Sequence, residues 1–301
     1  MLQRLAIATL LLFLQCQASA DTTLYRVSKS GSELYLGGTI HLLRTIDYPL
    51  PKEFDDAYQH ASQVYFETDL GKVNDPMVAQ QLAIALMYTD GKTLATDMEP
   101  KNWQALKTFA AERQFPIERF TMFKAVFVSL MFTVAELQKL GMGSNGVDMH
   151  FYQQALKDKK AIGELETVDD MLTFMRSTGD LKPDDVMAST MRDLTNIQSL
   201  MREMLKHWRA GDLKKLDGEM GEQMRKESPE LYQTLVVQRN QKWLKVLEKV
   251  LATPETELVL VGALHLPGDQ GLLHLLEKQG YKIEPYRITP KTVGQSAASS
   301  G

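Results

Sequence analysis

The sequence predicts an α/β (α+β) protein with a mixed central β-sheet built from N- and C-terminal segments and a large, mostly helical middle. Short apolar runs with strand-like character cluster near the two ends, at residues 24–28, 33–39 and 258–261. The intervening chain instead carries apolar residues mostly at helical spacing. If the two ends form one sheet, residues that follow strands at either end reach the same edge of that sheet.

The first 20 residues are typical of a signal peptide. Arg4 precedes an apolar run at residues 5–14, and Ala18-Ser19-Ala20 supplies a small-x-small cleavage site, so we expect cleavage after Ala20. A retained membrane anchor is the alternative, but a run of about 10 residues is short of the roughly 20 that span a bilayer. Acylation of Cys16 is a minor alternative, because the residues before it are not small. We therefore expect an exported protein, periplasmic or secreted.

Composition limits the chemistry and the partners. Of 301 residues, 44% are hydrophobic and 24% are charged, which is typical of a globular chain. Cys16 is the only cysteine, so the mature chain has no disulfide, thiol nucleophile or cysteine-bound zinc. Without Arg4 the chain keeps 33 of its 34 basic residues against 38 acidic ones, a net charge of −5. No basic patch stands out, so nucleic acid is not an expected partner.

The N-terminal part reads as a hairpin, a helix and a strand. Residues 24–28 and 33–39 form the hairpin, and Pro51 marks the start of a helix over residues 52–63. Residues 64–68 are a short apolar strand that ends on acid. We expect a single domain over residues 21–288, followed by a disordered tail over residues 289–301.

The middle reads as a series of helices. Residues 117–140 are the most apolar part, but their uncharged stretch of about 11 residues is too short to span a membrane and indicates a buried helix. Thr167 and Asp170 resemble a capping box. The predicted helices cover residues 76–88, 100–113, 117–140, 147–156, 183–252 (broken at Gly211 and Pro229) and 269–279, and strands cover residues 160–166, 258–261 and 281–287.

Two strands end in the same pattern, Gly-x-x-His, at Gly38 to His41 and at Gly262 to His265. Ligands of open α/β sheets gather at the carboxyl ends of strands. A glycine there lets a ligand or another chain come close, and imidazole is the commonest protein metal ligand. One such histidine is usually structural, whereas two at strand ends indicate a shared site.

Glu67 is the third candidate, because its strand carries it to the sheet edge. Taken alone it could be a salt-bridged surface acid. With His41 and His265 it would complete a set of two histidines and one carboxylate, which leaves coordination positions open for water. A divalent ion there supports hydrolysis. No His-Glu-x-x-His motif is present, so this is not a conventional zinc protease.

Three further residues are candidates for the same site. Glu166 is a general acid/base, a hydrogen-bond partner for a ligand histidine, or simply a charge at a helix N-terminus. Arg239 could stabilise an oxyanion or grip a substrate carboxylate, with Asn240 beside it in substrate binding, or it could form a surface ion pair. The remaining histidines look structural: His60, His150, His207 and His274.

An ordered series of segments resembles the TraB/PrgY/GumN family over residues 22–288. One departure is Met122-Phe123-Lys124, where many members have a Pro-Trp pair. The matching segments are Gly38-Thr39-Ile40-His41, Tyr48-Pro49-Leu50-Pro51, Val64-Tyr65-Phe66-Glu67, Gly146-Val147-Asp148, Gly163-Glu164-Leu165-Glu166-Thr167, Arg239-Asn240-Gln241-Lys242-Trp243 and Val261-Gly262-Ala263-Leu264-His265-Leu266-Pro267-Gly268.

The resemblance implies a fold related to erythromycin esterase and the haem-uptake lipoprotein ChaN, and a relation to the Tiki metalloproteases. It implies an active centre of His41, Glu67 and His265 that works with manganese or cobalt; zinc fits the same donors. Our first hypothesis is an exported metal-dependent hydrolase acting on peptides or a small-molecule substrate, with Glu67 and Glu166 catalytic. The alternative is a non-catalytic binding protein for a peptide, haem or a metal.

Overall fold

The computed structural model describes residues 22–143 and 145–288, and a six-stranded mixed sheet lies at its centre. The strand order is β4-β3-β5-β2-β1-β6. The N-terminal strands therefore lie next to the C-terminal ones, as the sequence predicted. The strands are β1 (Leu24–Lys29), β2 (Ser32–Thr39), β3 (Gln63–Phe66), β4 (Ala161–Glu164), β5 (Glu257–Gly262) and β6 (Lys282–Pro285).

Strand direction brings four carboxyl ends to one edge of the sheet. The neighbours β4, β3, β5 and β2 run parallel, whereas β1 is antiparallel to both β2 and β6. In the register, Thr39 pairs with Gly262, and Phe66 pairs with both Leu260 and Glu164. Every residue of β5 is buried, as expected for a strand in the middle of a covered sheet.

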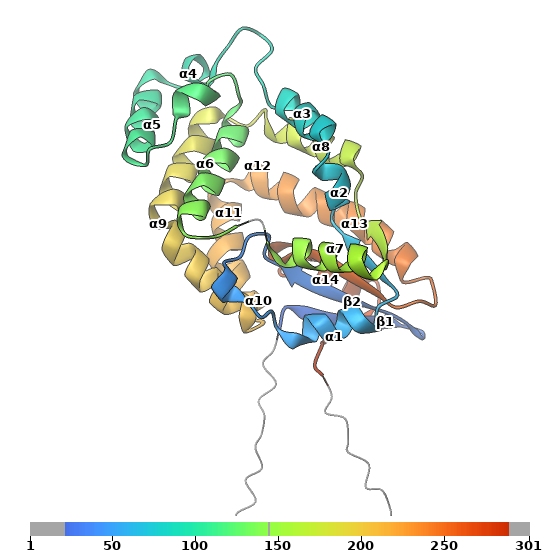
Figure 1. Cartoon of the computed structure of the whole chain (residues 1–301). Helices are drawn as coiled ribbons and strands as arrows, with labels where there is room; N and C mark the ends of the chain where they lie inside the picture. The colour runs from blue at the N-terminus through green and yellow to red at the C-terminus, as the bar shows by residue number, and fades with distance from the viewer. Residues whose placement is uncertain (1–21, 144, 289–301) are drawn as a thin grey trace, which may run out of the picture.

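Helices cover the sheet on both faces. In Figure 1, α1 (Lys52–His60) and α7 (Val147–Asp158) lie in front of the sheet, and α13 (Arg239–Val250) and α14 (Leu272–Lys278) lie behind it. Phe54 of α1 stacks with Phe151 of α7 at 6.3 Å between ring centroids. Trp243 and Leu247 of α13 are fully buried in the same core. The sheet edge that carries the strand ends is therefore held between packed layers.

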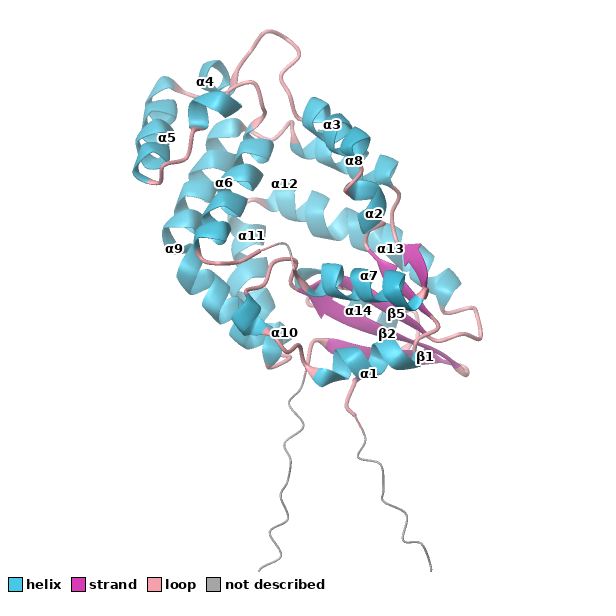
Figure 2. Cartoon of the chain, viewed as in Figure 1, coloured by secondary structure: helices cyan, strands magenta, loops and turns pink. Residues whose placement is uncertain are grey.

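The helical middle has a second hydrophobic core of its own. Phe132 of α6 (Ala125–Lys139) stacks on Phe115 at 4.2 Å, and Leu194 of α9 (Pro183–Arg209) packs with them. Figure 2 shows α9 as a long helix beside α6, and α12, α13 and the π-helical segment between them as one nearly continuous rod. The remaining helices are η1 (Thr45–Asp47), α2 (Leu70–Val73), α3 (Pro76–Ala85), α4 (Leu94–Asp97), α5 (Pro100–Glu112), η2 (Ile117–Phe120), α8 (Val168–Thr178), α10 (Leu213–Leu216), η3 (Asp217–Gly221), α11 (Glu222–Glu227), α12 (Pro229–Tyr232), η4 (Gln233–Gln238) and η5 (Ala263–His265).

Several predicted helices have other limits in the structure: the helix predicted at residues 76–88 ends at Ala85, and that at residues 269–279 spans Leu272–Lys278. The helix at residues 52–63 stops at His60, because Gln63 already pairs in β3. The predicted helix at residues 117–140 is split: a short 3₁₀ turn ends at Phe120 and α6 begins at Ala125. Between them Phe123 bridges Met87, and the Lys124 amide donates to the Leu86 carbonyl, so tertiary pairing overrides helix propensity. The capping box of Thr167 and Asp170 is confirmed.

The predicted signal peptide at residues 1–20 and tail at residues 289–301 lie outside the described residues. Across residues 22–143 and 145–288, no helix is long and apolar enough to cross a membrane. The apolar α6 is a core helix, with Val128 and Phe132 fully buried.

Candidate functional site

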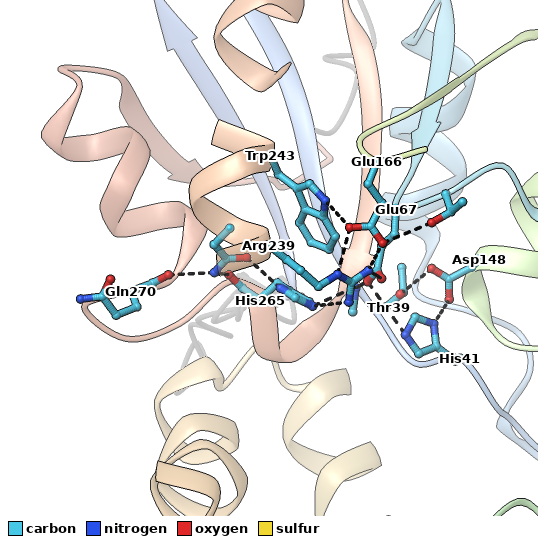
Figure 3. A network of polar contacts seen from close by, with 12 residues as sticks. Thr39, His41, Glu67, Asp148, Glu166, Arg239, Trp243, His265 and Gln270 are labelled. Atoms are coloured by element: carbon cyan, nitrogen blue, oxygen red, sulfur yellow. Dashed lines mark hydrogen bonds and ion pairs between the residues drawn. The ribbon is translucent and has the colours of Figure 1, made fainter. Parts of the chain in front are cut away.

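The sheet brings His41, Glu67 and His265 to one point. Their elements β2, β3 and β5 are neighbours, with β5 in the middle. Oε1 of Glu67 lies 4.0 Å from Nε2 of His41 and 3.9 Å from Nε2 of His265. Figure 3 shows the three side chains converging from separate strand ends. The two Gly-x-x-His segments therefore lie close together, as the sequence predicted.

Gly262 makes room for this convergence. A Cβ at this position would lie 3.2 Å from both Glu67 Oε1 and His41 Nε2, and 3.6 Å from Cδ2 of His265. The missing side chain thus leaves space at the centre of the three groups. Gly38 has a different role, because a Cβ there would lie 2.8 Å from the Leu266 side chain. It allows close packing of the chain after β5.

Hydrogen bonding fixes the tautomer of His265. Nδ2 of Asn240 donates to the carbonyls of His265 and Gln270, at 3.0 and 2.8 Å. This orients the amide so that its oxygen faces Nδ1 of His265, at 2.7 Å. Because that oxygen can only accept, Nδ1 must carry the proton. Nε2 of the neutral ring is then a bare acceptor directed at Glu67. Burial, the largest effect, lowers the pKa of His265 to about 4, so the ring is neutral at pH 7.

His41 is held by an acid. Its Nδ1 donates to Oδ2 of Asp148 at 2.8 Å, and the Thr39 hydroxyl donates to the other oxygen at 2.7 Å. The Asp148 charge raises the pKa of His41 to about 9. The His41 side chain is 61% exposed, so solvent reaches the ring from the side away from Asp148. Both histidines therefore bind an acceptor through Nδ1 and turn Nε2 towards Glu67.

The Glu67 side chain is ionised at neutral pH. Oε1 accepts the Gly262 amide at 2.7 Å, and Oε2 accepts Nη2 of Arg239 at 2.6 Å. Burial alone would raise the pKa of Glu67, but Arg239, then His265 and His41, outweigh it and hold the pKa well below its usual range. The carboxylate therefore faces the shared space ionised.

Arg239 joins two carboxylates. Its Nη2 donates to Oε1 of Glu166 at 2.7 Å and its Nε donates to Oε2 at 3.1 Å, in addition to the bond to Glu67. The guanidinium lies over the Trp243 ring, 4.4 Å from its centroid, one helical turn along α13. Nε1 of Trp243 donates to Glu166 at 3.0 Å, and Thr68 donates at 3.3 Å. Glu166 is almost fully buried, and both of its carboxylate oxygens accept hydrogen bonds from these donors. It therefore positions Arg239 and has no hydrogen bond to His41 or His265.

The donor set fits a divalent ion in type and nearly in spacing. Two imidazole nitrogens and a carboxylate suit Mn²⁺, Co²⁺ or Zn²⁺. Two ligands on one tetrahedral ion lie roughly 3.4 Å apart, about half an ångström closer than the separations here. Across residues 22–143 and 145–288, no three such side chains are close enough to hold an ion as they stand. Nη1 of Arg239 lies 3.5 Å from Nε2 of His265 and supplies positive charge at this point.

Sequence reasoning found most of this site but not all of it. The six candidate residues lie together, and Asn240, which we expected in substrate binding, is fully buried and hydrogen-bonded to His265. The residue without an assigned role was Asp148; its signal was an acid in the first turn of α7, two residues after Gly146. Trp243 appeared only as the last residue of one segment that resembles the family. The other four histidines contact residues elsewhere, such as Asp56 for His60 and Glu219 for His207.

Comparison with known proteins gives the class of this chain. The model of the TraB/PrgY/gumN family matches residues 23–285, so the chain belongs to that family. The match spans every strand of the sheet and all the residues of the site. No curated protein and no solved structure matches the chain.

Proposed function

We propose that this protein is an exported, metal-dependent hydrolase that acts on peptides. His41, Glu67 and His265 are the proposed ligands of one divalent ion, with Mn²⁺, Co²⁺ and Zn²⁺ as the candidates. A bound divalent ion supplies a Lewis acid that makes water more acidic and polarises a carbonyl.

One observation carries the proposal: two imidazole Nε2 atoms and an ionised carboxylate face a space that only a glycine leaves open. Asn240 and Asp148 occupy the Nδ1 positions, as hydrogen-bond partners of metal-bound histidines usually do. Nε2 of His265 and Oε1 of Glu67 direct lone pairs at the same space from 3.9 Å apart, which is unfavourable without a cation between them. Arg239 and the protonated His41 ring offset this from either side, and an ion would replace the His41 proton.

The other residues have roles that follow from their contacts. Arg239 can donate to an oxygen that gains negative charge during attack on a carbonyl, because Nη1 already points towards the shared space. Glu166 and Trp243 hold the guanidinium in place. Glu67 presents Oε1 to the space, where it would hold the ion and can accept a hydrogen bond from water. Exposure of His41 leaves an entrance for substrate.

The test is metal content followed by activity. Purified wild-type protein, dialysed against Mn²⁺, Co²⁺ or Zn²⁺, should retain about one ion per chain by elemental analysis. His41→Ala should retain far less, and His60→Ala, a histidine away from the site, should match the wild type. A peptide-library cleavage screen with each ion then seeks activity that Glu67→Gln abolishes. Equal metal content in wild type and His41→Ala would remove His41 as a ligand.

A non-catalytic binding protein is the second candidate, and Arg239 favours it. The guanidinium is paired with both Glu67 and Glu166, so each carboxylate has a cationic partner even without an ion. In that case the same cluster would grip an anionic or carboxylate-bearing ligand. Metal content equal to background in the wild type, together with no cleavage under any ion, would favour this reading.

A further inference from the structure

A separate cavity lies among the helices of the middle of the chain. It has a volume of about 470 Å³, in the range of ligand pockets. Its walls come from one face of α6, one face of α9, and the chain from η3 to α12. Leu194, Met201, Met220 and Met224 make it largely apolar. Methionine side chains adapt to different apolar shapes, so such a wall accepts a range of ligand side chains.

Carboxylates outnumber cations around this cavity. Asp185, Asp193, Glu227 and Glu230 line it, against one lining cation, Lys182. Arg192 forms an ion pair with Glu227 at 2.6 Å. It does not pair with the other three lining acids, Asp185, Asp193 and Glu230. Burial, with the Glu227 charge, raises the pKa of Asp193. An apolar pocket with excess negative charge at its rim complements a ligand that is apolar and cationic.

The cavity and the site lie along the same helical rod. Leu231 of α12 lines the cavity, and Arg239 of α13 reaches the site eight residues later, with the π-helical η4 between them. At about 1.5 Å per residue, eight residues span roughly 12 Å. An extended peptide covers that length with about four residues. In Figure 2 this rod runs from the α11 and α9 side towards the sheet.

We infer that the cavity is a recognition subsite for peptides, and that it takes an apolar side chain next to a Lys or Arg, about four residues from the position held at Arg239. The inference rests on the proposed function, because it names the substrate class of the same site. The apolar side chain fills the space beside Met201 and Met224, and the neighbouring cation lies among Asp185 and Glu230.

The experiment measures binding in a background that does not cleave. The protein is the full chain with Glu67→Gln. The probes are fluorescein-labelled octapeptides with one Leu-Lys pair at either end and Gly and Ala elsewhere, followed by fluorescence anisotropy. We expect saturable binding of at least one orientation. Ser189→Phe, which fills the cavity from α9, should weaken it about tenfold or more. Ser199→Phe, an exposed position on the same helix that does not line the cavity, should not.

A second pair of variants tests the charge. Asp185→Asn with Glu230→Gln should weaken binding and flatten its salt dependence, while Glu118→Gln with Glu255→Gln, two exposed acids elsewhere, should leave both unchanged. Replacing Lys by Glu in the probe should abolish binding. Binding unchanged in a folded Ser189→Phe protein, or equal binding of the Lys and Glu probes, overturns the inference. Binding that behaves as expected without metal retention or cleavage rejects the hydrolase proposal alone.

Discussion

The side-chain oxygen of Asn240 lies 2.7 Å from Nδ1 of His265, and the amide nitrogen of the same side chain donates to two backbone carbonyls. Asn240 is fully buried, so none of these groups can turn to water. A side-chain amide donates through its nitrogen and accepts through its oxygen, which suits both sets of partners here. This residue therefore sets both the position of the His265 loop and the nitrogen that His265 offers to the site.

Asn240→Asp should destabilise the fold. The carboxylate would face the carbonyls of His265 and Gln270, so one buried acceptor and one partly buried acceptor would lose their donor. We expect the free energy of unfolding to fall by about 1–3 kcal/mol, from urea denaturation followed by circular dichroism. Gln241→Glu, the neighbouring amide on the exposed face of α13, is the control and should change stability little. A loss of equal size in both variants would contradict this account.

Gly262→Ala should remove the shared space without unfolding the protein. The new Cβ would lie 3.2 Å from both Glu67 Oε1 and His41 Nε2, and the exposed His41 ring can swing away. We expect a stability change within about 1 kcal/mol and a loss of metal affinity on the order of tenfold or more. Isothermal titration with Mn²⁺ measures the affinity. Gly218→Ala, where an added Cβ meets open space, should keep it.

Trp243→Phe should weaken the packing that holds the Arg239 guanidinium in place. Phenylalanine keeps a ring under the guanidinium but cannot donate to Glu166, whose buried oxygen then loses a partner. We expect destabilisation of about 1–3 kcal/mol. The matched control for loss of an indole is Trp103→Phe, because Trp103 is a half-buried tryptophan in α5, away from the site. Thermal unfolding of both variants checks this, and a larger loss in Trp103→Phe would refute it.

In metal-free protein the two histidines should give opposite pH trends. The pKa of His265 is lowered from 6.5 to about 4, so between these values the unfolded chain binds a proton that the folded protein does not, and stability rises with pH. The pKa of His41 is raised from 6.5 to about 9. Between these two pH values the folded protein holds a proton that the unfolded chain has lost, so stability falls as pH rises. Solvent screening at the exposed His41 ring makes the second change the smaller.

NMR titration of the imidazole Cε1–H signals after EDTA treatment measures both values directly. Asp148→Asn keeps a hydrogen-bond acceptor for His41 but removes the charge that raises its pKa. The variant should shift the His41 titration back towards 6.5 and leave that of His265 unchanged. A His41 titration near 9 in Asp148→Asn would assign the shift to another group.

Local pattern predicted the fold class and the three central residues. Strand alternation and the glycines before His41 and His265 are properties of short segments, so they can be read without the rest of the chain. The helix limits were less predictable. Residues 121–124 leave the helical path because Lys124 and Tyr88 form backbone bonds with distant partners, which no local propensity contains.

The sequence by itself determined that two segments of the same Gly-x-x-His pattern follow strands from opposite ends of the chain, and that an acid follows a third strand. Tertiary structure decided how different these histidines are. His41 stands in solvent beside Asp148, 107 positions away, and gains proton affinity, whereas His265 is buried beside Arg239 and loses it. The physical reason is that burial and neighbouring charge set a pKa, and packing of distant segments supplies both.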